Sequence, residues 1–173
     1  MRSSSSSDAE TREAGRASLG TMSSAPADVN DPCLGCSIVE GRVRPVGGVL
    51  LREGGLVLHG LAGASPLAGW VVLSAERHAR ALYDLDPVAA SALGPLAARV
   101  MRAQREVLGA EHAYAFAIGD VLRHFHLHLV PLYADTPERL RGRGAFEGQP
   151  ADMLPAERLE EACARLAEAL RKG

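Results

Sequence analysis

Apolar residues and histidines alternate strictly over residues 124–129, and this alternation predicts a β-strand with two different faces. The apolar side chains are expected to point into a hydrophobic core, and the histidines to line the opposite face (Phe125, Leu127 and Leu129 against His124, His126 and His128). Alternate side chains on one face of a strand lie roughly 6.5–7 Å apart. The three imidazoles are therefore spaced to act on neighbouring atoms of one ligand.

Shorter patterns predict the rest of the fold. Two apolar runs around Gly54-Gly55 indicate a hairpin. A helix is expected between Asp86-Pro87, which are typical of a helix start, and Gly109, which is typical of a helix end. Gly94-Pro95 is expected to kink that helix or split off its first turn. Further strands are expected over 70–73 and 114–118, and a last amphipathic helix from about 155. This order of elements favours an antiparallel α+β domain.

Composition and charge bound the domain count and the function class. The chain has 173 residues, enough for one domain, and we place that domain at 31–173. Residues 1–30, with a serine run and almost nothing apolar, are predicted to be a disordered tail, and Met22 is an equally good start site. A net charge of −2 argues against binding nucleic acid by phosphate neutralisation, and no apolar run is long enough to cross a bilayer.

The histidine row has a clear chemical use. Half of the chain's six histidines lie in this one strand, which makes a chance occurrence on a solvated face a poor explanation. A neutral imidazole with one nitrogen held as N–H presents the other nitrogen as a nucleophile. Attack on phosphorus would give a phosphoramidate that water can hydrolyse, while neighbouring histidines donate hydrogen bonds to phosphate oxygens.

Cys33 and Cys36 form a C-x-x-C pair, which has the spacing of half a zinc site. A redox pair is the competing interpretation, although such a pair normally opens a helix in a βαβ pattern. Two structurally idle cysteines are the third possibility. Three cysteines are too few for a disulfide scaffold, and the N-terminus lacks the apolar centre of a signal peptide, so we expect a cytoplasmic protein.

The segment His124-Phe-His-Leu-His-Leu-Val resembles the signature of the histidine triad (HIT) family of nucleotide hydrolases and transferases. Two further segments also resemble that family, in the same order: the C-x-x-C segment over 31–41 and the strand over 69–78. The resemblance implies a five-stranded antiparallel sheet with a long helix and a C-terminal helix, and a homodimer.

The resemblance also implies roles for individual residues. His126 would be the nucleophile that receives a nucleoside monophosphate, and His128 would assist at the phosphate. Structural zinc would be held by two cysteines and two histidines (Cys33, Cys36, His78 and His124). The substrates would be dinucleoside polyphosphates or nucleoside phosphoramidates.

The segment before the histidine row departs from the family pattern. It is shorter, with Asp120 in place of a glutamine, and Arg123 follows as a possible phosphate contact; we take both as candidate substrate-binding residues. Trp70 stands where the family often has histidine. Two alternatives to the enzyme therefore stay open: a non-catalytic relative that is a ligand-binding or interaction module, and a metallohydrolase that uses the triad histidines as ligands. His59 and His112 are expected to be surface or partly buried histidines, and Cys163 is expected in the core.

Overall fold

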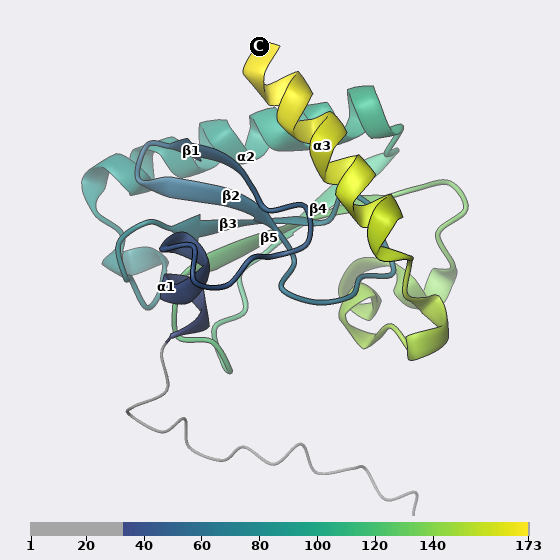
Figure 1. The fold of residues 1–173 in the computed structure, drawn as a ribbon, viewed down its shortest axis with the longest axis horizontal. Coiled ribbons are helices and arrows are strands. Elements are labelled where there is room, and N and C mark those ends of the chain that lie inside the picture. The colour runs from purple at the N-terminus through teal and green to yellow at the C-terminus, as the bar shows by residue number, and fades with distance from the viewer. Residues whose placement is uncertain (1–32, 173) are drawn as a thin grey trace, which may run out of the picture. The chain divides into compact units, whose positions relative to one another are not determined.

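The structure, a computed structural model, describes residues 33–172, so the predicted tail over 1–30 lies outside the described residues. Within this range five strands form one antiparallel sheet in the order β1-β2-β3-β5-β4 (Figure 1). The strands are β1 (Val49–Glu53), β2 (Leu56–Gly60), β3 (Val71–Ala75), β4 (His112–Phe116) and β5 (His126–Leu132). The predicted α+β class with a five-stranded antiparallel sheet is confirmed.

The main core lies between one face of this sheet and two long helices. These are α2 (Pro87–Leu108) and α3 (Ala156–Lys172), which pack against each other and lie together in Figure 1. Leucine and valine side chains from strands and helices fill the space between them, with Leu73, Leu129, Val100 and Leu166 at or near zero exposure. Cys163 lies in the same core, as predicted. The histidine face of the sheet is thus turned away from the long helices.

The β1–β2 hairpin forms where the two glycines predicted it. Gly54 and Gly55 have φ angles of 57° and 73°, the left-handed region that a tight two-residue turn requires at both central positions. Residues with a Cβ rarely adopt this conformation, which is why the glycine pair marks the turn. Strand β2 in turn pairs with β3, and β3 pairs with β5.

Helix α2 has the predicted ends but not the predicted break. The Asp86 side chain accepts hydrogen bonds from the backbone N–H groups of Val88 and Ala89, and Gly109 ends the helix in the left-handed conformation. The helix nevertheless runs without interruption through Pro95. Pro95 and Ser91, whose carbonyl loses its helical partner, are both exposed, so water can satisfy that carbonyl.

The segment between β5 and α3 folds into three short 3₁₀ turns: η2 (Glu138–Leu140), η3 (Gly142–Glu147) and η4 (Pro150–Asp152). Arg139 pairs with the carboxylate of Asp152 across this segment, and that carboxylate also accepts from the backbone N–H of Gln149. Ala145 of η3 packs with Trp70 and Val130 in a second, smaller apolar cluster. This cluster lies on the histidine side of the sheet, so part of that side is covered.

A short helix, α1 (Leu34–Val39), carries the cysteine pair at its start. None of the helices within 33–172 combines the length and the apolar character needed to span a membrane.

Candidate functional site

Four side chains from three separate parts of the chain meet at one point: Cys33, Cys36, His78 and His124. Their ligand atoms all lie within 4.8 Å of one another. Cys36 lies in α1, His78 follows β3, and His124 precedes β5, so the sheet and the N-terminal helix converge here. The resemblance to the histidine triad family implied this set, and the structure brings all four residues together.

The spacing of these atoms suits a tetrahedral zinc ion. Zinc bonds of about 2.3 Å to sulfur and about 2.0–2.1 Å to nitrogen, at tetrahedral angles, place a sulfur and a nitrogen about 3.5 Å apart. The His124 Nδ1 lies 3.5 Å from the Sγ atoms of both Cys33 and Cys36, and the His78 Nδ1 lies 3.3 Å from the Cys36 Sγ. The residues present therefore fit zinc.

The hydrogen bonding of His124 leaves the correct nitrogen free for a metal. Its Nε2 lies 2.8 Å from the carbonyl oxygen of Ala75, which can only accept, so Nε2 carries the proton. The Nδ1 then directs a lone pair at the two cysteine sulfurs. Such an outer hydrogen bond orients metal-binding histidines generally. Burial of the ring also lowers the pKa of His124, which favours the neutral form that binds metal.

Gly35 is required for the close approach of α1 to His124. A Cβ at Gly35 would lie 2.3 Å from the Cγ of His124, far inside van der Waals contact. We predict that Gly35→Ala destabilises the fold by about 1–3 kcal/mol and weakens zinc binding, because the ring must move away from the sulfurs. Urea unfolding together with zinc analysis of the purified variant tests this.

Gly63→Ala is the matched control for that substitution. A Cβ at Gly63 meets nothing within 4 Å beyond its chain neighbours, and the residue is exposed in the loop between β2 and β3. Alanine there is expected to change stability by less than about 0.5 kcal/mol and to leave zinc content unchanged. A Gly35→Ala protein with full zinc content and full stability would contradict the close approach.

His126, the first residue of β5, has a defined tautomer. Its Nδ1 lies 2.6 Å from the carbonyl oxygen of His124, so Nδ1 carries the proton and Nε2 carries the lone pair. The ring is nearly buried, with 9% exposed. Among residues 33–172 its Nε2 has no hydrogen-bond partner, and it is not one of the fully buried unpaired atoms, which belong to Arg99 and Gln104.

His128 lies beside His126 with the opposite arrangement of its nitrogens. The two ring centroids are 5.1 Å apart. The indole N–H of Trp70 points at the Nδ1 of His128 over 3.1 Å, so the proton of neutral His128 is on Nε2. Burial, with a smaller contribution from the charges of His126 and His59, lowers the pKa of His128 to about 4. At neutral pH this ring is therefore an uncharged hydrogen-bond donor.

His59 and Ser74 lie on the same face of the sheet as His126 and His128, and the sequence analysis placed neither of them there. His59 is fully buried, rather than at the surface or partly buried as expected. Its Nδ1 donates to the carbonyl of Gly60 over 2.6 Å, and its Nε2 accepts from the Ser74 hydroxyl over 2.8 Å. Burial lowers the pKa of His59. Ser74 is the cross-strand partner of His126. The usable signal was the strand alternation that places His59 on the histidine face.

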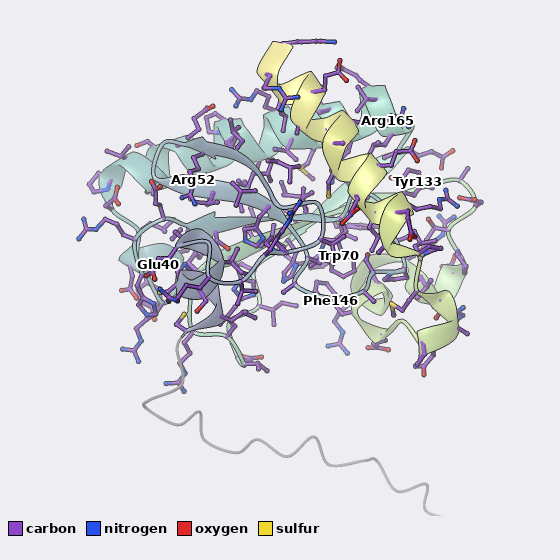
Figure 2. The ribbon with its side chains drawn as sticks, viewed as in Figure 1. Glu40, Arg52, Trp70, Tyr133, Phe146 and Arg165 are labelled. Atoms are coloured by element: carbon purple, nitrogen blue, oxygen red, sulfur yellow. The ribbon has the colours of Figure 1, made fainter. Side chains whose placement is uncertain are left out.

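Phe146 of η3 is the other residue that sequence reasoning missed. Its ring makes edge-on contacts with both His128 and Trp70, at centroid distances of 5.1 and 4.8 Å, and Figure 2 shows Trp70 and Phe146 next to each other. No periodicity in 133–155 indicated this contact. The rings of Trp70 and Phe146, which we call the aromatic wall, therefore border the histidine face at His128.

The two predicted substrate contacts lie outside this arrangement. Asp120 and Arg123 are both exposed, in the loop between β4 and β5. Within residues 33–172 neither forms a hydrogen bond or ion pair with His126 or His128. The site as it stands consists of the four-ligand cluster, the adjoining pair of histidines, and the aromatic wall.

No known family profile matches the sequence, and no curated protein matches it. Solved structures do resemble it. A zinc-bound histidine triad family protein from Mycobacterium smegmatis is 21% identical, with 82% of this chain and 94% of that chain covered and a TM-score of 0.62. A hypothetical histidine triad nucleotide-binding protein from Sulfolobus tokodaii is 16% identical, with 81% and 93% covered and a TM-score of 0.63.

A Hit-like protein involved in cell-cycle regulation from Bartonella henselae gives a similar result. It is 14% identical, with 81% of this chain and 97% of that chain covered and a TM-score of 0.62. The resemblance inferred from the histidine and cysteine motifs is thus confirmed at the level of the fold. This chain has the histidine triad fold.

Proposed function

We propose that this protein hydrolyses nucleotides, or transfers nucleotidyl groups, by way of a covalent bond between phosphorus and the Nε2 of His126. The observation that carries the proposal is the tautomer of His126. Its Nδ1–H is held by the His124 carbonyl, and its Nε2 lone pair, which has no partner among residues 33–172, lies next to the ring of His128, a hydrogen-bond donor. The substrates are compounds with a phosphoanhydride or phosphoramidate bond to a nucleoside monophosphate.

The reaction proceeds in two displacements. In the first, the Nε2 lone pair forms a bond to phosphorus while the bond from phosphorus to the leaving oxygen or nitrogen breaks, and the leaving group takes that electron pair and is protonated from water. In the second, water attacks phosphorus, its proton passes to solvent, and the electron pair of the N–P bond returns to Nε2. An alcohol or phosphate in place of water gives nucleotidyl transfer.

The backbone hydrogen bond to His126 favours the first step. When Nε2 becomes bonded to phosphorus, positive charge develops on the imidazole and the Nδ1–H becomes a stronger donor. The carbonyl of His124, 2.6 Å away, is already in place to stabilise that charge. Because the interaction is stronger after bond formation than before, it lowers the barrier as well as orienting the ring.

His128 contributes a neutral donor next to the nucleophile. With its proton on Nε2, it can donate to a phosphate oxygen without presenting a second lone pair to the anion. Asp120 and Arg123 are proposed as contacts to the parts of the substrate outside the reacting phosphate. Zinc in the four-ligand cluster is proposed to be structural. The homodimer and the cytoplasmic location expected from the sequence remain predictions.

A non-catalytic ligand-binding role is the second candidate. It is favoured by Phe146 and Trp70, which pack against His128 and narrow the space beside it. A metallohydrolase is less well supported. The His124 Nδ1 points at the cysteines, and the Nδ1 atoms of the other two triad histidines are already engaged. Within residues 33–172 the one cluster with metal-ligand spacing is the Cys₂His₂ set.

Incubation with an adenosine phosphoramidate and with a diadenosine polyphosphate tests the proposal. Release of adenosine monophosphate from either compound supports it. Binding of both compounds without turnover supports the second candidate instead. Turnover that stops with a chelator while the fold is retained would favour the metallohydrolase.

A further inference from the structure

Trp70 donates a hydrogen bond to His128, the histidine that the proposed function places at the phosphate. Its indole N–H lies 3.1 Å from the Nδ1 of His128, and the two rings meet edge-on with centroids 5.7 Å apart. An indole N–H can only donate, so the His128 Nδ1 must accept and its Nε2 must carry the proton. The family pattern often has a histidine at this position, which can donate or accept. Tryptophan removes that ambiguity.

The surroundings of Trp70 hold the indole in place. The side chain is 6% exposed and packs among apolar residues of the second cluster. On the far side of the sheet, the buried Gln104 of α2 donates from one amide nitrogen to the carbonyls of Gly69 and Leu129, at 2.9 and 3.0 Å. Gly69 precedes Trp70 and Leu129 follows His128. One side chain thus ties together the backbone next to both rings.

We propose that Trp70 is a positioning residue that holds His128 in one ring orientation and in the Nε2–H tautomer, so that this ring donates to the phosphate beside His126. The role at the phosphate rests on the proposed function, whereas the tautomer and the hydrogen bond do not. With the proton on Nδ1 instead, the Nε2 lone pairs of His126 and His128 would lie side by side and both would repel an anionic oxygen. The Trp70 N–H prevents that arrangement.

The groups that face His128 also favour its neutral form. His126 comes from its own strand and His59 from β2. Trp70, Phe146 and the cross-strand partners of His128, which are Val72 of β3 and Phe116 of β4, are uncharged. A hydrogen bond donated to the neutral ring stabilises that form against protonation. Loss of the indole N–H therefore raises the pKa of His128.

NMR of the zinc-containing protein tests the hydrogen bond directly. We expect long-range ¹H–¹⁵N spectra to show His128 protonated on Nε2, with a scalar coupling across the bond from the Trp70 indole nitrogen to the His128 Nδ1. In Trp70→Phe, which keeps an aromatic ring but has no donor, the pKa of His128 rises. In Trp70→His, whose Nε2 can reach the place of the indole nitrogen, the pKa returns toward that of the parent.

Tyr133→Phe is the matched control. It removes the partly buried hydrogen bond that the Tyr133 hydroxyl donates to the carbonyl of Ala68, and it is expected to leave the tautomer and pKa of His128 unchanged. A parent protein with His128 protonated on Nδ1, or a His128 pKa that is the same in Trp70→Phe, overturns the proposal. So does a Trp70→His variant that titrates like Trp70→Phe, because ring packing alone would then set the pKa.

Kinetics separate this proposal from the proposed function. If the protein is a hydrolase, Trp70→Phe is expected to lower kcat about five- to tenfold with little change in KM, as the loss of one well-placed hydrogen bond implies. An inactive parent protein with the predicted NMR signature would refute the proposed enzymatic function but not the hydrogen bond from Trp70 to His128. An active parent protein whose kcat is unaffected by Trp70→Phe would refute the positioning role of Trp70 but not the enzymatic function.

Discussion

His126→Ala is expected to lower turnover of an adenosine phosphoramidate by about 10³-fold or more, because no other atom in the site can take over the bond to phosphorus. The Nε2 of His128 is protonated, and the Nδ1 of His124 is directed at the cysteine sulfurs. Nucleotide affinity is expected to change little, since the lost group acts mainly in the transition state. Steady-state kinetics and equilibrium binding of adenosine monophosphate measure the two effects.

His112→Ala is the control histidine for this experiment. His112 is exposed at the start of β4, on the outer edge of the sheet, and its removal should leave turnover unchanged. Zinc content and unfolding free energy should be the same in both variants, apart from about 1 kcal/mol for the hydrogen bond that His126 loses. Substantial turnover in His126→Ala would mean that the nucleophile lies elsewhere.

Removal of the metal is expected to have the largest effect on stability. Cys36→Ser, or treatment with a strong chelator, should lower the unfolding free energy by several kcal/mol, because the four ligands join the N-terminal helix to two strand ends. For a domain of this size that corresponds to a fall in Tm of about 10–20 °C. Thermal unfolding followed by circular dichroism, with zinc measured on the same samples, provides the comparison.

Cys163→Ala distinguishes the metal site from cysteine loss in general. This residue is buried in the main core, away from the cluster, so the variant should retain one zinc per chain and lose only a modest amount of stability. Parent protein purified without zinc, or with a Tm that a chelator does not change, would contradict the assignment.

The metal cluster and the nucleophile share one residue. The His124 ring faces the cysteines, while its backbone carbonyl holds the Nδ1 proton of His126. Displacement of His124 therefore disturbs the tautomer of His126 as well as the cluster. We expect turnover to fall in parallel with zinc content across partially depleted samples.

Most elements of the fold could be predicted from short sequence patterns, because each pattern depends on the local conformation of a few residues. The alternation over 126–129 is a property of one strand, which begins at His126 rather than at His124 as predicted. The glycine pair of the first hairpin and the Asp86 cap of the long helix each depend on a few adjacent residues. Pro95 was different. Its effect depends on whether the freed carbonyl of Ser91 faces solvent, and that is decided by how the helix packs.

In the candidate site, only the residues that belong to recognisable sequence motifs could be predicted. The cysteine pair and the histidine row are visible in the sequence, and the resemblance supplied His78. The hydrogen bond from Trp70 to His128 depends on the registers of β3 and β5, which place residues 58 positions apart in contact. Phe146 reaches the site from a segment with no periodic pattern, so nothing in its local sequence indicated the contact.

The most direct measurement is the mass of the intact protein a few milliseconds after mixing with an adenosine phosphoramidate, quenched in base to protect an N–P bond. We expect a transient species heavier by one adenylyl group, which peptide fragmentation assigns to the imidazole of His126 and which His126→Ala does not form. Product released with no adduct at any time, or an adduct on another side chain, would contradict this expectation.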